Sequence, residues 1–147
     1  MEPSNYSNPV IKILIIEDDE EMRSLLRDFV EEEGYEADTV GDGYEAFRRL
    51  VKEPFALVVT DVRMPGLTGL DILPKIRKLQ PGIPIIVITA FGSEEVYRRA
   101  LERGATAYLE KPIHFQKLKE LLHQMVSSSF NPHPSLEREE KEGKSRG

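Results

Sequence analysis

The sequence has no cysteine among its 147 residues. It therefore cannot form a disulfide framework, a thiolate zinc site or a cysteine nucleophile, and it fits the reducing cytoplasm, which is the location we expect. It also has no excess of basic residues, because 20 lysines and arginines stand against 26 aspartates and glutamates, for a formal net charge of −6. Since nucleic-acid binding relies on basic surfaces, direct contact with DNA or RNA is not expected.

Long hydrophobic runs are missing as well. The longest apolar runs, such as Ile83 to Ala90, are interrupted by polar residues or proline and fall far short of the ~20 residues that span a bilayer. We therefore expect no membrane-spanning segment. Residues 1–9 are polar, contain two prolines and lack the basic start and apolar stretch of a signal peptide, so we expect a flexible leader there.

The residues that are present suit one compact domain. Hydrophobic residues make up 39% of the chain and charged residues 31%, which is enough apolar material for a core. β-Branched runs alternate with segments whose apolar residues recur every three or four positions, as expected for strands that alternate with amphipathic helices. The expected strands are 10–16, 35–40, 55–60, 85–89 and 107–109, and the expected helices are 20–33, 44–51, one that ends near Leu79, 94–103 and 115–126.

This alternation predicts an α/β fold with a single open, doubly wound, parallel five-stranded sheet covered by helices on both faces. The domain is expected to span residues 10–126. Residues 127–147 are rich in serine, proline and charge, which predicts a flexible tail or a truncated linker.

Pro74 conflicts with a helix that ends near Leu79, since an interior proline costs about 3 kcal/mol. We therefore expect Asp71 to be the N-cap of a late-starting helix, or the helix to be kinked.

Polar residues stand at the carboxyl ends of the expected strands, where ligands bind in open α/β sheets. These residues are Glu17, Asp18, Asp19, Asp61, Thr89 and Lys111. Asp19 is expected to be a helix cap, whereas the other carboxylates need a cation between them. Hard oxygen ligands favour Mg²⁺. A magnesium site beside a carboxylate, a hydroxyl and a lysine suits phosphoryl transfer, with Asp61 as the nucleophile and with Thr89 and Lys111 at the phosphoryl oxygens.

Four segments then stand out together: ILIIEDDEEMRSLL, VVTDVRMPGLTGLDIL, IPIIVITAFG and GATAYLEKPI. In this order they resemble the receiver domain of two-component response regulators, from about Ile11 to Val126, and their wording is most similar to receivers of the nitrogen-regulation type. The resemblance implies a flavodoxin-like (βα)5 fold. It also implies that Asp61 is the phosphoacceptor and that Mg²⁺ is held by Glu17, Asp18, Asp61 and the backbone carbonyl of Arg63.

The resemblance further implies a switch formed by Thr89 and Tyr108, in which the aromatic ring moves inward when the hydroxyl is drawn to the phosphoryl group. It implies a cis Lys111–Pro112 bond. The phosphoryl donor would be a histidine kinase or a phosphotransfer protein. The output surface, formed by the helices at 94–103 and 115–126 and the strand between them, would contact a downstream protein or output domain, or form a phosphorylation-dependent homodimer.

Two alternatives remain at this point. One is a metal-dependent phosphohydrolase with an aspartyl nucleophile, although Arg63, two residues after Asp61, cannot supply the general acid that such an enzyme needs. The other is a binding module of the same fold that is never phosphorylated. We expect no enzymatic activity beyond self-catalysed phosphotransfer and self-dephosphorylation. Self-dephosphorylation should be slow, because Phe91, two residues after Thr89, is bulky enough to screen the acyl phosphate from water.

Overall fold

A computed structural model describes residues 10–63, 68–90 and 92–128. Strands and helices alternate along these residues, which confirms the predicted α/β fold. The strands are β1 (Lys12–Ile16), β2 (Glu36–Val40), β3 (Leu57–Asp61), β4 (Ile85–Thr89) and β5 (Ala107–Glu110). The helices are α2 (Glu20–Glu32), α3 (Gly43–Lys52), α4 (Gly69–Leu79), α5 (Glu94–Glu102) and α6 (Phe115–Ser128). The predicted leader at 1–9 and residues 129–147 of the predicted tail lie outside the described residues, whereas residues 127 and 128 belong to α6.

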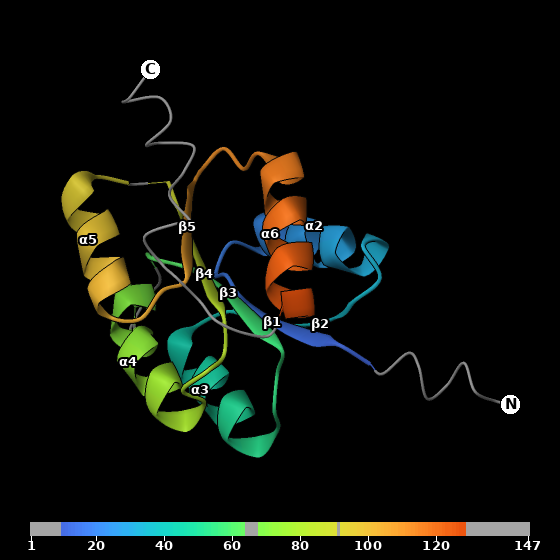
Figure 1. The fold of residues 1–147 in the computed structure, drawn as a ribbon, viewed down its shortest axis with the longest axis horizontal. Helices are drawn as coiled ribbons and strands as arrows, with labels where there is room; N and C mark the ends of the chain where they lie inside the picture. Colours follow the sequence, from blue (N-terminus) through green and yellow to red (C-terminus); the bar gives the residue numbers. More distant parts are fainter. Residues whose placement is uncertain (1–9, 64–67, 91, 129–147) are drawn as a thin grey trace, which may run out of the picture.

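The five strands form one parallel sheet in the order β2-β1-β3-β4-β5. Because β1 lies inside the sheet, the chain winds outward from it in both directions, and helices come to cover both faces. Figure 1 shows α2 and α6 on one face and α3, α4 and α5 on the other. All strands point the same way, so their carboxyl ends meet at one edge, and the order reverses between β1 and β3 at that edge.

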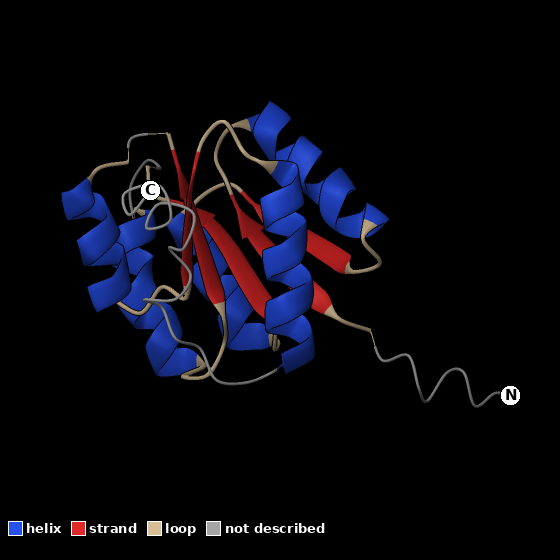
Figure 2. Ribbon diagram, turned by 45° about the horizontal axis from the view of Figure 1, so that its top comes forward, coloured by secondary structure: helices blue, strands red, loops and turns tan. Residues whose placement is uncertain are grey.

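Each face of the sheet packs against its helices through a separate hydrophobic core. Alternate residues of β1 divide between the two: Ile13 and Ile15 pack with Leu26 of α2 and Leu122 of α6, and Leu14 packs on the opposite side. All five residues of β3 and of β4 are buried. This burial on both sides explains why these strands are continuous apolar runs in the sequence rather than alternating ones. Figure 2 shows the sheet between its two layers of helices.

Side chains immediately before the helices define where the helices start. Asp19, Asp42, Thr68 and Ser93 each accept a hydrogen bond from the backbone N–H three residues later, which satisfies an amide that has no partner within the helix. His114 accepts in the same way from the Lys117 amide at the start of α6. Among the described residues, no helix combines the length and apolar character that a membrane span requires.

The start of α4 differs from the sequence-based expectation. Thr68, not Asp71, is the N-cap, so α4 begins at Gly69 and Pro74 lies inside the helix. A proline at this position cannot donate a hydrogen bond to the carbonyl of Leu70, four residues earlier. The Leu70 carbonyl instead accepts a hydrogen bond from Arg103 Nη1, at 3.2 Å. The helix therefore tolerates Pro74 because a side chain from the end of α5 satisfies the carbonyl that the proline leaves without its helical donor.

Candidate functional site

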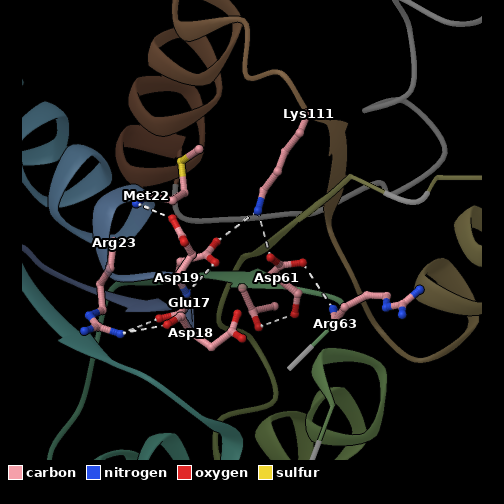
Figure 3. Close-up of polar contacts among 9 residues, drawn as sticks. Glu17, Asp18, Asp19, Met22, Arg23, Asp61, Arg63 and Lys111 are labelled. Carbon is pink, nitrogen blue, oxygen red and sulfur yellow. Dashed lines mark hydrogen bonds and ion pairs between the residues drawn. The ribbon is translucent and has the colours of Figure 1, made fainter. Parts of the chain in front are cut away.

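The carboxyl edge of the sheet brings four charged side chains together (Figure 3). Glu17 and Asp18 follow β1, Asp61 is the last residue of β3, and Lys111 follows β5. One carboxylate oxygen from each of Glu17, Asp18 and Asp61 lies within 4.8 Å of the others. Glu17 and Asp61 are buried, at 2% and 7% exposure, whereas Asp18 is exposed. The cluster is thus anchored in the sheet and open to solvent on one side.

Lys111 bridges the two buried carboxylates. Its Nζ donates to Asp61 Oδ2 at 2.8 Å and to Glu17 Oε1 at 3.2 Å. Burial alone would lower the pKa of Lys111, but the hydrogen bond and charge of Asp61, together with those of Glu17, outweigh it and raise the pKa. The lysine is therefore positively charged at neutral pH. The Lys111–Pro112 peptide bond is cis, as the resemblance implied.

Glu17 is the most strongly perturbed carboxyl group among those with a resolved shift. Burial raises the pKa of Glu17 from 4.5 to about 7, and the nearby charge of Asp61 adds to the increase. The Asp19 amide, which donates to Glu17 Oε2 at 3.1 Å, and the Lys111 ammonium oppose this increase in the pKa. The protein surroundings therefore stabilise the ionised form of Glu17 only in part. A divalent cation bound among the carboxylates would stabilise this ionised form further.

Backbone groups fix the loops that carry the carboxylates. The Arg63 amide donates to Asp61 Oδ1 at 3.1 Å, while the Arg63 guanidinium points away from the cluster (Figure 3). Gly69, the first residue of α4, lies so close to β3 that a Cβ atom on it would be 1.9 Å from the Asp61 carbonyl oxygen. Only glycine permits this approach. Residues 64–67, which connect these two points, are outside the described residues.

Arg23 is a residue at the site that sequence reasoning did not identify. It extends from α2, and its Nη1 donates to the carbonyl of Glu17 at 2.9 Å and to that of Asp18 at 3.5 Å. These bonds hold the backbone of the acidic loop (Figure 3).

The prediction that Asp19 caps a helix is confirmed. Asp19 Oδ2 accepts a hydrogen bond from the Met22 amide at 2.8 Å, so this carboxylate caps α2 and is not part of the cluster.

Thr89 and Tyr108 lie on the two neighbouring strands beyond Asp61. Thr89 ends β4, is fully buried, and pairs in register with Glu110 of β5. Its carbonyl accepts from the Lys111 amide at 2.8 Å, which links β4 to the lysine loop. The Tyr108 ring is buried at 2% exposure and packs edge-on against Tyr97 of α5, with centroids 5.2 Å apart. Phe91, also singled out in the sequence, lies outside the described residues.

The chain is a doubly wound, five-stranded α/β domain with a lysine-bridged carboxylate cluster at the switch point of its sheet. The sequence matches the response regulator receiver domain family over residues 13–123. The chain belongs to this family, whose members act as signalling switches in two-component systems rather than as enzymes.

Two curated relatives are transcriptional regulators that are longer than this chain. The chain is 36% identical over 117 residues to the transcriptional regulatory protein ZraR of Salmonella typhimurium, an alignment that covers 80% of this chain and 26% of ZraR. It is 33% identical over 120 residues to the DNA-binding transcriptional regulator NtrC of Azospirillum brasilense, covering 82% of this chain and 25% of NtrC. The similarity to nitrogen-regulation-type receivers is thus confirmed. The chain spans about a quarter of the length of these relatives.

Two solved structures resemble the fold closely. The beryllofluoride-activated NtrC4 receiver domain dimer aligns with a TM-score of 0.77 and 30% identity, over 81% of this chain and 98% of that one. The response regulator TrrA from Thermotoga maritima, solved in complex with Mg²⁺ and BeF, aligns with a TM-score of 0.72 and 34% identity, over 79% and 99% of the two chains. Family membership and the acidic cluster agree with a magnesium-dependent signalling domain.

Proposed function

We propose that Asp61 accepts a phosphoryl group from a histidine kinase or a phosphotransfer protein. The observation that supports this most strongly is the Lys111 ammonium 2.8 Å from Asp61 Oδ2, where Asp61 forms a cluster of three carboxylates with Glu17 and Asp18. An Asp61 oxygen attacks the phosphorus, and the bond from phosphorus to the donor imidazole breaks. The imidazole nitrogen keeps the electron pair, and the product on Asp61 is an acyl phosphate.

The negative charge of the transferred group is met by residues already at the site. Lys111 hydrogen-bonds Asp61 directly, so its ammonium is within reach of an oxygen of a group attached to that carboxylate, and the Thr89 hydroxyl binds another. The three carboxylates offer the hard oxygen donors that Mg²⁺ prefers, with an open side for water. When bound by Glu17, Asp18, Asp61 and the Arg63 carbonyl, Mg²⁺ would neutralise charge on the phosphoryl oxygens.

The output is conformational. A phosphoryl group adds about two negative charges at the carboxyl edge, and Thr89 and Tyr108 carry its effect to the surface formed by α5, β5 and α6. That surface contacts a downstream protein or output domain, or a second copy of the chain. The activated dimer of the NtrC4 receiver domain supports the last arrangement, a dimer of two copies of the chain.

Light scattering should detect a doubled mass when BeF₃⁻ and Mg²⁺ are added, and an unchanged mass would rule the homodimer out.

The proposal is tested by exposing the protein to acetyl phosphate and Mg²⁺ and separating phosphorylated from unmodified chains on a phosphate-affinity gel. Wild type should be modified, and Asp61→Asn should not. Asp28→Asn is the matched control, because Asp28 is exposed on α2, and it should be modified like wild type. Labelling of Asp61→Asn at the wild-type level would refute the proposal.

The two alternatives give different results in the same preparation. A phosphohydrolase turns over a generic phosphate ester such as para-nitrophenyl phosphate many times, whereas we expect no turnover. A binding module that is never phosphorylated acquires no label from acetyl phosphate.

We also expect slow self-dephosphorylation, so that the modified protein persists for minutes or longer, and a half-life of seconds would contradict this.

A further inference from the structure

The backbone at Gly92, between β4 and α5, runs very close to two side chains of β5. A Cβ atom on Gly92 would lie 2.5 Å from Tyr108 Oη and 2.3 Å from Glu110 Oε2, whereas real Cβ contacts are essentially never below 3.0 Å. Among the described residues, Gly82 offers a contrast, since a Cβ there would meet nothing within 4 Å. A side chain at position 92 therefore cannot coexist with Tyr108 and Glu110 in their observed positions.

The two close contacts differ in how easily they could be relieved. Glu110 is exposed and its carboxylate is the end of a flexible side chain, so it can rotate into solvent. Tyr108 is a rigid ring, buried at 2% exposure and packed against Tyr97. Because protein interiors are close-packed, the ring cannot move deeper to give way. The conflict would be relieved if the ring turned outward, away from Tyr97.

We propose that Gly92 is a positioning residue for Tyr108: the absence of a side chain at position 92 is what admits the tyrosine ring to its inward position. The consequence for signalling rests on the proposed function, in which the inward ring is coupled to the phosphoryl group on Asp61. Gly92 is three residues after Thr89 and directly precedes Ser93, the N-cap of α5. The segment that makes room for Tyr108 therefore joins the switch hydroxyl to a helix of the output surface.

The position of the ring can be read without any phosphoryl group. Tyrosine rings are labelled with ¹³C, and the Tyr97 signal, assigned with Tyr97→Phe, reports whether an aromatic ring packs against it. Gly92→Ala should displace the Tyr97 signal, and Gly82→Ala should leave it unchanged. Tyr108→Phe removes the hydroxyl that a Cβ at position 92 would strike, so the Gly92→Ala/Tyr108→Phe double variant should give the same Tyr97 signal as Tyr108→Phe alone.

A second measurement links the ring to the site. If Gly92→Ala lowers the inward population to about a tenth, the apparent affinity for BeF₃⁻ with Mg²⁺ should fall about tenfold, since affinity scales with the competent fraction. The double variant should recover the affinity of Tyr108→Phe. An unmoved Tyr97 signal in Gly92→Ala, or a double variant that stays displaced or does not fold, would overturn the proposal. If Gly92→Ala alone fails to fold, recovery of the fold in the double variant supports it.

These outcomes separate the two proposals. Normal modification of Asp61 by acetyl phosphate in a Gly92→Ala protein with an unmoved Tyr97 signal would contradict the role of Gly92 and leave the proposed function standing. A wild-type protein that is never modified, together with a displaced Tyr97 signal in Gly92→Ala, would contradict the proposed function and leave the role of Gly92 standing.

Discussion

Lys111 supplies the positive charge between the two most buried carboxylates of the site. Its Nζ contacts both Asp61 and Glu17. Lys111→Met should therefore slow phosphorylation by acetyl phosphate about 10²-fold or more, because it removes a preorganised charge from the phosphoryl oxygens. It should also lower the free energy of unfolding by about 1–3 kcal/mol, because it leaves buried carboxylates without their hydrogen-bond donor.

The matched control is Lys12→Met. Lys12 pairs with Glu53 and Asp38 and stands at the start of β1, at the opposite end of the strand from the site. This variant should leave the phosphorylation rate unchanged. A Lys111→Met protein that is phosphorylated as fast as Lys12→Met would show that the lysine does not act on the phosphoryl group.

Glu17 should make the stability of the metal-free protein depend on pH. Burial raises its pKa in the folded protein to about 7, from 4.5 in the unfolded chain. Between these values the folded state binds more protons than the unfolded state, so stability falls as the pH rises. The shift corresponds to roughly 3 kcal/mol at 1.36 kcal/mol per unit. With a chelator present, the unfolding free energy of wild type minus that of Glu17→Gln should decrease by about this amount from pH 4.5 to 8. A constant or increasing difference would contradict the shift.

At the residue scale, sequence reasoning found the groups that carry charge and missed those that act through the backbone. Glu17, Asp61 and Lys111 were predicted because they follow or end strands whose carboxyl ends meet at one edge of the sheet, where ligands bind. Arg23 was not, because an arginine on a half-exposed helix resembles many solvated ones, and only the structure shows it reaching carbonyls of the acidic loop. Gly92 was missed because its role depends on the absence of a Cβ atom, and only the structure shows that such an atom would lie too close to Tyr108 and Glu110.

At the scale of elements, the contact between Arg103 and Leu70 joins the end of α5 to the first turn of α4. Arg103 Nη1 bonds the Leu70 carbonyl at 3.2 Å and lies 3.7 Å from Asp71. Arg103→Met should lower the unfolding free energy by about 1–2 kcal/mol, because that carbonyl loses its donor. In a Pro74→Ala background the cost should be smaller by about 1 kcal/mol, since the N–H of the new residue can bond Leu70.

The exposed pair between Arg98 and Glu102 provides the control for this double-mutant cycle. Its atoms are 3.9 Å apart and both side chains are more than half exposed, so Arg98→Met should change stability by no more than about 0.5 kcal/mol. Equal costs of Arg103→Met with and without Pro74 would show that the arginine does not compensate for the proline.

The elements themselves were predicted to within about two residues at most ends, because continuous β-branched runs differ clearly from segments whose apolar residues recur every three or four positions. The start of α4 was the exception. A local rule against interior proline favoured Asp71 as the N-cap, but Thr68 and a distant arginine decided the outcome. That arginine is 29 positions away from Pro74 in the sequence, so no local pattern could have revealed it.

At the scale of the whole molecule, strand order creates the site. Parallel strands place Glu17, Asp61, Thr89 and Lys111 at one edge, and the order β2-β1-β3-β4-β5 makes β1 and β3 neighbours. The alternation of strands and helices predicted this edge. It could not predict that Lys111 contacts both Asp61 and Glu17, because these contacts depend on distances of a few ångströms that packing sets.

An acyl phosphate on Asp61 can be identified by chemical trapping. Wild-type protein is treated with acetyl phosphate and Mg²⁺, reduced with borohydride, digested, and sequenced by mass spectrometry. Borohydride converts an aspartyl phosphate to homoserine, so we expect homoserine at position 61 and at no other aspartate, with none formed when acetyl phosphate is left out. Homoserine at a different aspartate, or phosphate on a serine, threonine or histidine with position 61 unmodified, would contradict it.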